Sequence, residues 1–129
     1  MERRIINPWT WQEQYGFQHG HEVTGGRTLY LAGQVSLDGE GQLVHAGDMA
    51  GQINQSIDNI EAVLAAAGMT LADIVRLNVY TTDVDLLLEH YGILSRVNEA
   101  GGRFASTLLG VARLAFPELL VELEATAVA

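Results

Sequence analysis

Hydrophobic and polar residues alternate near the end of the chain in the pattern typical of a β-strand. Apolar residues occupy every second position of segment 119–125, and Glu122 and Glu124 lie between them. Because successive strand side chains point to opposite faces, we expect one apolar face and one face with two carboxylates. A second strand is predicted from Ser106, joined to the last by a short turn at residues 115–118. The paired carboxylates are either a solvated sheet face or part of a site.

Three further segments have the alternation expected of strands. Segments 17–23 and 28–34 are predicted to form a hairpin around Gly25 and Gly26, because paired glycines tolerate the positive φ of tight turns. Gly33 ends the second of these segments, where a missing side chain lets another backbone or a ligand come close. In segment 74–81, apolar residues at 75, 77 and 79 alternate with Arg76, Asn78 and Tyr80.

Spacings of three and four residues between apolar positions predict two helices. The first is expected to begin after the N-cap Asp48 and to run to about Ala67, with Gly68 as its stop. The second, with an aspartate N-cap at position 83 or 85, is expected to run to about position 100, before two glycines. Both helices would bury one apolar side.

The elements therefore follow the order β-β-α-β-α-β-β in a single domain of residues 1–129, with residues 1–16 as an irregular arm held by aromatic side chains. We expect an α+β two-layer sandwich, a mixed sheet with two helices on one face. The other face of the sheet would then lack a helix layer. Self-association is the simplest way to cover it.

Composition narrows the classes of function. The net charge of −9 argues against nucleic-acid binding, which needs a basic surface. No apolar run is long enough to span a membrane, and the first residues lack the apolar core of a signal peptide. The absence of cysteine excludes disulfides and thiolate chemistry. These features fit a cytoplasmic protein.

His19 and His21 raise the question of a metal site, because both imidazoles would share one strand face. A metal needs three or four ligands, and the spacing of the other two histidines supplies no third. We therefore predict no metal. The roles of His19 and His21 stay open.

Several short motifs, taken together and in order, resemble those of the Rid family, the reactive intermediate deaminases also called YjgF-like proteins. The motifs are Ala32-Gly33-Gln34, Gly47-Asp48 with Gln52, Gln55-Ser56 and Asn59-Ile60, Ala66-Ala67-Gly68 with Asp73-Ile74-Val75, Val79-Tyr80 with Thr82-Asp83, Val111-Ala112-Arg113-Leu114 and Val121-Glu122-Leu123-Glu124-Ala125. The resemblance implies a chorismate-mutase-like fold and a homotrimer with small-molecule clefts between subunits. It also implies hydrolysis of reactive enamines and imines, such as 2-aminoacrylate, to a keto acid and ammonia without a cofactor.

The resemblance assigns roles to residues of this chain. It places the catalytic glutamate at Glu122 and the glycine that the ligand approaches at Gly33. A family tyrosine falls on Phe17, which lacks the hydroxyl. The family arginine that binds the substrate carboxylate falls on Ser106, and Arg103 lies three positions earlier, an odd offset that would point it to the other strand face. Ser106 and Thr107 would then hold a polar group of the substrate.

The loss of this arginine leaves more than one function open. The first is hydrolysis or tautomerisation of a reactive enamine, imine or related carbonyl compound, with Glu122 as general base. The second is a non-catalytic protein that binds a metabolite or protects other proteins. The third is RNA cleavage, an activity attributed to some relatives, which the acidic composition disfavours.

Overall fold

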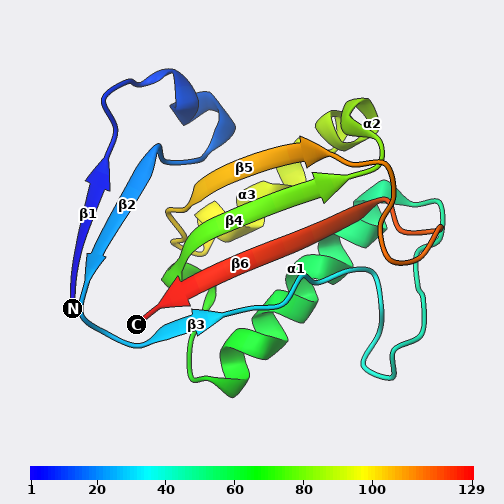
Figure 1. The fold of residues 1–129 in the computed structure, drawn as a ribbon, viewed down its shortest axis with the longest axis horizontal. Coiled ribbons are helices and arrows are strands. Elements are labelled where there is room, and N and C mark those ends of the chain that lie inside the picture. The colour runs from blue at the N-terminus through cyan, green and yellow to red at the C-terminus, as the bar shows by residue number, and fades with distance from the viewer.

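A mixed sheet of four strands forms the centre of the molecule, and the computed structural model describes all residues 1–129 (Figure 1). The strand order is β3-β6-β4-β5. The strands are β3 (Thr28–Tyr30), β4 (Ile74–Thr81), β5 (Ala105–Gly110) and β6 (Val121–Val128). β4 and β5 are parallel, whereas β6 is antiparallel to both β3 and β4. The predicted mixed sheet is confirmed.

The first predicted helix is confirmed at both ends. α1 (Met49–Ala66) begins after Asp48, whose side chain accepts a hydrogen bond from the Gly51 N–H at 3.0 Å. Gly68 follows the helix with a φ of 71°, a conformation that glycine adopts without strain.

The second predicted helix is broken into three short pieces. They are α2 (Val84–Glu89), the 3₁₀ turn η3 (Tyr91–Leu94) and α3 (Ser95–Glu99). Asp83 caps the first piece, accepting from the Leu86 N–H at 3.0 Å. His90 leaves helical angles, and Gly92 follows within the next turn, where glycine weakens a helix. Each of the three pieces nevertheless buries one apolar side chain of the predicted helix: Leu87, Leu94 and Val97.

α1 and α3 lie behind the sheet in Figure 1, so the expected two-layer arrangement holds. The core between the layers consists of fully buried side chains from both. From α1 these are Ile53, Ile57, Ile60 and Leu64, and from the sheet Leu77, Val79, Leu123 and Ala127. The front face of the sheet carries no helix.

The N-terminal region differs from the prediction in two ways. Residues 1–16 are not irregular throughout: they contain β1 (Glu2–Ile6) and the 3₁₀ turn η1 (Trp11–Tyr15). The predicted hairpin between 17–23 and 28–34 is wrong, because β2 (Gly20–Thr24) pairs antiparallel with β1 and β3 pairs with β6. Gly25 and Gly26 do have positive φ, but they direct the chain from one sheet to the other.

The connection before β6 also differs from the prediction. Residues 111–120 do not form a short turn between neighbouring strands, because β4 lies between β5 and β6 in the sheet. This connection therefore crosses the end of β4. The backbone N–H of Val111 donates to the Thr81 carbonyl at 2.8 Å, which fixes where the crossing begins.

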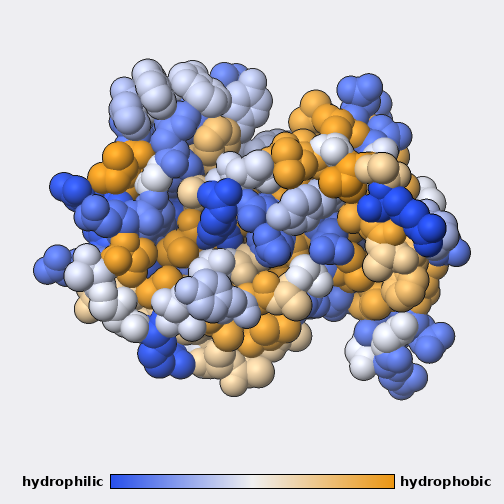
Figure 2. All heavy atoms as spheres, in the orientation of Figure 1, coloured by the Kyte–Doolittle hydropathy of each residue, from blue (hydrophilic) through white to orange (hydrophobic).

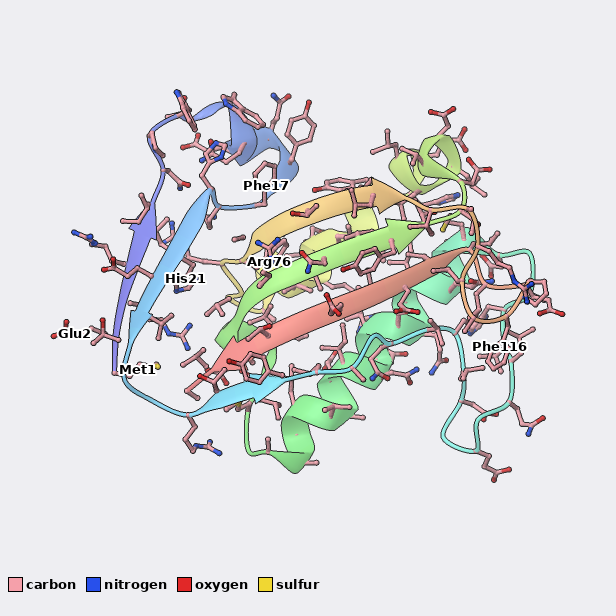
Figure 3. All side chains as sticks on the ribbon, in the orientation of Figure 1. Met1, Glu2, Phe17, His21, Arg76 and Phe116 are labelled. Carbon is pink, nitrogen blue, oxygen red and sulfur yellow. The ribbon has the colours of Figure 1, made fainter.

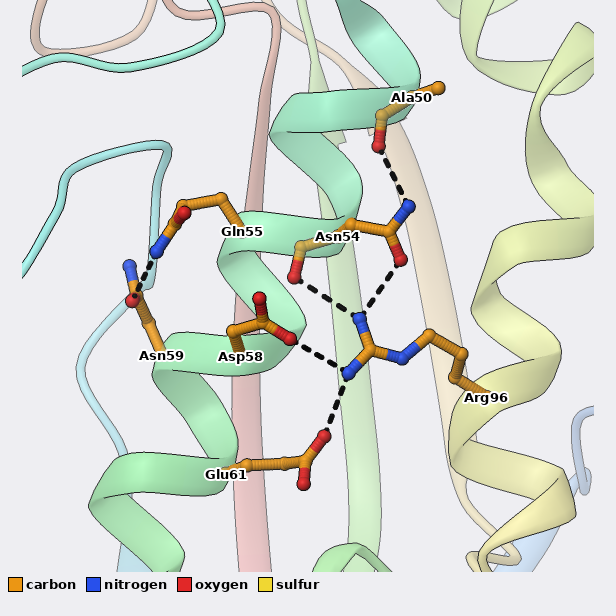
Figure 4. A network of polar contacts seen from close by, with 7 residues as sticks. All are labelled: Ala50, Asn54, Gln55, Asp58, Asn59, Glu61 and Arg96. Atoms are coloured by element: carbon orange, nitrogen blue, oxygen red, sulfur yellow. Dashed lines mark hydrogen bonds and ion pairs between the residues drawn. The ribbon is translucent and has the colours of Figure 1, made fainter.

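Polar side chains of α1 hold the surrounding elements in place. Arg96 of α3 donates to Asp58 and Glu61, both at 2.8 Å, and to the Asn54 side chain at 2.9 Å (Figure 4). Asn59 donates to the carbonyls of Val35 and Leu37, each at 2.9 Å. These contacts fix α3 and the loop after Gly33 to the same helix.

The open face of the sheet mixes apolar and polar side chains (Figure 2). Tyr30, on this face, is 80% exposed, more than any other large hydrophobic side chain of the chain. None of the helices has the length and hydropathy needed to cross a membrane.

Candidate functional site

The open face of the sheet brings polar side chains of β4 and β6 together. In the antiparallel register Tyr80 lies opposite Glu122, and Asn78 lies opposite Glu124. Partners in register point to the same face, and the alternate residues Leu77 and Leu123 are fully buried against the helices. Both glutamates therefore lie on the face without helices, where Figure 3 shows the side chain of Arg76 as well.

Glu122 lies directly against Gly33. A Cβ atom built on Gly33 would come within 2.1 Å of Oε2 of Glu122 and 2.7 Å of its Cδ. Gln34 and Leu123 exchange two backbone hydrogen bonds of 2.7 and 3.0 Å, which bring the Gly33 backbone beside β6. Close approach at Gly33 was predicted, and the group that approaches it is the candidate catalytic carboxylate.

Glu124 has a different environment, with two neutral donors on one oxygen. The Asn78 amide and the Tyr80 hydroxyl each donate to Oε1 of Glu124 at 3.0 Å. The amide oxygen of Asn78 is buried and accepts no hydrogen bond within the chain. The Glu124 carboxylate is thus held by two hydrogen-bond donors, whereas the amide oxygen of Asn78 beside it has no donor.

These environments move the pKa values of the two carboxyls in opposite directions. Burial raises the pKa of Glu122, and the nearby charge of Glu124 raises it further. The hydrogen bonds from Asn78 and Tyr80 lower the pKa of Glu124, with a smaller contribution from Arg76. The pair therefore has one carboxyl that stays charged and one that is a better proton acceptor than an ordinary glutamate.

The remaining predicted site residues are separated from Glu122 within one chain. Thr107 lies opposite Asn78 and accepts a hydrogen bond from Arg76 at 3.0 Å. Ser106 is in register with the buried Leu77, so its side chain points toward the helices. It is thus on the opposite face of the sheet from Glu122.

Phe17 lies beyond the β5 edge, because the next residue, Gln18, bridges to Ala105. β5 and β4 therefore lie between Phe17 and β6. Figure 3 shows Phe17 near the end of β2, close to the two-stranded β1–β2 sheet. Phe17 packs edge-on against Trp11 and His19. Arg103 lines a cleft together with Phe17.

The two histidines of the N-terminal region have separate surroundings. His19 packs edge-on against Trp9, Trp11 and Phe17, with ring centroids 4.8 to 5.6 Å apart. Nδ1 of His21 forms a hydrogen bond with the Arg103 carbonyl. No group of three or more His, Cys, Asp or Glu side chains is placed to hold a metal ion.

Asn78 and Tyr80 contribute to the site but were not predicted as site residues. The alternation of segment 74–81 correctly placed them on the polar face of a strand. Their partnership with Glu124 depends on the register between β4 and β6, which are far apart in the sequence. The only local signal was that Asn78 and Tyr80 are polar residues on the strand face opposite the buried one.

Known structures share this fold over most or all of the chain. The structure of YyfB from Yersinia pestis, described as a protein of unknown function of the conserved Rid family, is 40% identical with a TM-score of 0.90 and covers 100% of both chains. The structure of the YjgF gene product from Escherichia coli is 30% identical with a TM-score of 0.70, covering 87% of each chain.

Curated relatives and a family model agree with the structural comparison. The 2-iminobutanoate/2-iminopropanoate deaminase of Escherichia coli K12 is 32% identical over 105 residues, 80% of each chain. Protein DfrA of Myxococcus xanthus is 34% identical over 83 residues, which span 64% of this chain and 58% of DfrA. The family model described as Endoribonuclease L-PSP matches residues 16–129. The chain therefore belongs to this family, whose members include the Rid proteins.

Proposed function

We propose that the protein hydrolyses or tautomerises a small, reactive enamine, imine or related carbonyl metabolite, with Glu122 as the general base. The observation that carries this proposal is the Glu122 carboxylate, which packs against Gly33 and has its pKa raised by burial. A general base works best when its pKa lies near the operating pH. The similarity to 2-iminobutanoate/2-iminopropanoate deaminase supports the choice of substrate class.

In this mechanism Glu122 takes a proton from a water molecule as the water oxygen bonds to the imine carbon. The C=N π electrons move to nitrogen, which takes up the proton held by Glu122, and a carbinolamine forms. Glu122 then takes the carbinolamine hydroxyl proton and passes it to the nitrogen, the C–N bond breaks with its electron pair going to nitrogen, ammonia leaves, and the C=O product forms. An enamine first tautomerises to the imine by proton transfer to carbon.

We further propose that three copies assemble with a small-molecule cleft between each pair. Within one chain, Glu122 lies on a face that no helix covers, and Phe17 and Ser106 do not lie beside it. A neighbouring subunit would cover that face and supply the remaining walls of the cleft. In this arrangement Thr107, with its neighbour Arg76, would hold a polar group of the substrate.

The test is ammonia release from 2-aminoacrylate or 2-iminopropanoate generated in solution, followed by a broader set of imines and enamines. Wild type should accelerate release from at least one of these substrates. Glu122→Gln should lower that rate by about a hundredfold or more, since it keeps the shape but cannot accept a proton. Glu40→Gln, a change of an exposed turn residue, is the matched control. Equal rates for wild type and Glu122→Gln would contradict the proposal.

A non-catalytic binding or protective role is the alternative, and Ser106 is the residue that favours it. A serine hydroxyl offers one neutral donor, where an arginine would bind a carboxylate through two charge-assisted hydrogen bonds. This alternative predicts saturable binding of a metabolite without turnover. RNA cleavage, which the description of the family model suggests, is disfavoured by the net charge of −9.

A further inference from the structure

The open face of the sheet presents carboxylate oxygens that have no hydrogen-bond donor. Oε1 of Glu124 accepts from Asn78 and Tyr80, but Oε2 of Glu124 and both oxygens of Glu122 accept no hydrogen bond within the chain. Neither carboxylate belongs to an ion pair. Both side chains are partly exposed. These oxygens are therefore available to accept hydrogen bonds from a ligand.

Positive charge on this face does not balance the two carboxylates. The four strands of the sheet hold three charged side chains, Glu122, Glu124 and Arg76. Arg76 donates to Thr107 of β5 at 3.0 Å, so its guanidinium is directed away from β6 (Figure 3). The neighbouring charge that acts on the pKa of Glu122 is the negative charge of Glu124. Ser106 adds no charge and lies on the opposite face. The face therefore suits a cation better than an anion.

The spacing of the two glutamates fits a ligand of a few atoms. They are two residues apart on β6, so their Cα atoms are about 6.6 Å apart. Two charge-assisted N–H···O bonds of about 2.8 Å each cover most of this distance, so one small N–H cation can reach both carboxylates. Asn78 and Tyr80 both hold Oε1 of Glu124, which orients Oε2 toward a ligand and lowers the pKa of this carboxyl, so that it stays charged.

We propose that Glu124 binds the N–H groups of a protonated C=N group, and that the preferred substrate is the iminium ion of a small aldehyde or ketone without a carboxylate. This inference rests on the proposed function, because it concerns the substrate of the same site. As the water oxygen bonds to carbon, the C=N π electrons neutralise the nitrogen and Glu122 takes the water proton. Glu122 returns that proton to the nitrogen and takes the hydroxyl proton as the C–N bond breaks, with its electron pair going to nitrogen. Ammonia and the C=O product leave, and one proton passes to solvent.

The test compares acetamidinium, acetamide and acetate, which have the same shape and carry a positive, no and a negative charge. Binding is measured by calorimetry and by the shift of the Gly33 amide resonance, which reports from beside Glu122. Acetamidinium should bind most tightly and acetate most weakly. Glu124→Gln keeps the size of the side chain but removes its charge. This variant should raise the acetamidinium Kd about tenfold, the equivalent of about 1.4 kcal/mol, and should leave the acetamide Kd nearly the same.

Two control variants separate this site from general effects of charge and stability. Glu40→Gln removes the carboxylate of an exposed turn residue and should leave all three Kd values unchanged. Arg76→Gln removes the positive charge of the face and should strengthen acetamidinium binding, whereas a general loss of structure would weaken it.

Two results would overturn the inference: acetate that binds as tightly as acetamidinium, or a preference for acetamidinium that persists in Glu124→Gln. If imine hydrolysis still depends on Glu122, either result overturns this inference alone and leaves the proposed function intact. Acetamidinium binding through Glu124 without hydrolysis of any imine would instead contradict the proposed function and leave a cation-binding site.

Discussion

Two glutamates on one strand face have opposite acid–base properties because their neighbours differ. Glu122 has the uncharged surface of Gly33 beside it, and burial raises its pKa. Glu124, two positions later, receives hydrogen bonds from Asn78 and Tyr80, which lower its pKa. The charge that these donors retain on Glu124 in turn favours a proton on Glu122. Glu124 would thereby adjust the pKa of the proposed base.

Gly33 offers the sharpest single-residue test of this geometry. Gly33→Ala introduces a methyl group where the Glu122 carboxylate now lies, and the backbone there does not require glycine. Because a flexible carboxylate can move, we expect a stability cost of only about 1 kcal/mol. Activity should nevertheless fall by about tenfold or more, because the base is displaced. Thermal unfolding and steady-state kinetics measure the two effects, and an unchanged rate would show that this contact is irrelevant.

The sequence predicted the pair Glu122 and Glu124 but not the difference between them. Alternation alone placed both on one face, and the resemblance to Rid proteins singled out Glu122. The partners Asn78 and Tyr80 come from a strand more than forty positions earlier, and only the β4–β6 register joins them to Glu124. Ser106 was placed correctly on β5, but its orientation toward the helices depends on its pairing with Leu77.

At the scale of elements, α1 determines where β6 begins. Gln52 is fully buried, and its amide donates to the carbonyls of His45 and Glu118 at 3.1 and 3.0 Å. Its oxygen accepts from the Leu120 N–H at 2.8 Å. The two bonds with Glu118 and Leu120 hold the chain just before Val121. The position of Glu122, one residue later, follows from them.

Replacing this side chain should destabilise the protein strongly. Gln52→Leu keeps the volume but leaves three backbone groups without partners, which we expect to cost about 2–4 kcal/mol. Gln42→Leu, at an exposed turn, serves as the control and should change stability by less than about 0.5 kcal/mol. Urea unfolding of both variants gives the comparison. Equal stabilities would mean that α1 does not hold the start of β6.

Elements set by local patterns were predicted better than pairings between distant segments. α1 was correct at both ends because its cap, apolar stripe and glycine stop are all local signals. The predicted hairpin between segments 17–23 and 28–34 was wrong because β2 pairs with β1 instead. The β1 sequence, Glu-Arg-Arg-Ile-Ile, has no alternation of apolar and polar residues that would predict a strand. Arg3 anchors that strand by donating to the Val128 carbonyl and to Asp73, contacts over long sequence distances.

At the scale of the whole molecule, one face of the sheet is not covered by any element of the same chain. Tyr30 is 80% exposed on the face that also carries Glu122 and Glu124. An apolar or aromatic surface of this kind usually marks an interaction site. We therefore predict that light scattering will give the mass of three chains at micromolar concentration. A monomer under these conditions would remove the proposed cleft between subunits.

The pH dependence of kcat/KM for the best imine substrate tests the proposed base most directly. A general base acts only when deprotonated, so the rate should fall as the pH drops through the pKa of Glu122. Because burial raises that pKa, we expect this acid limb to lie above the ordinary glutamate value of 4.5. In Glu122→Gln the residual rate should lose the limb. An acid limb that persists unchanged in this variant would contradict the account.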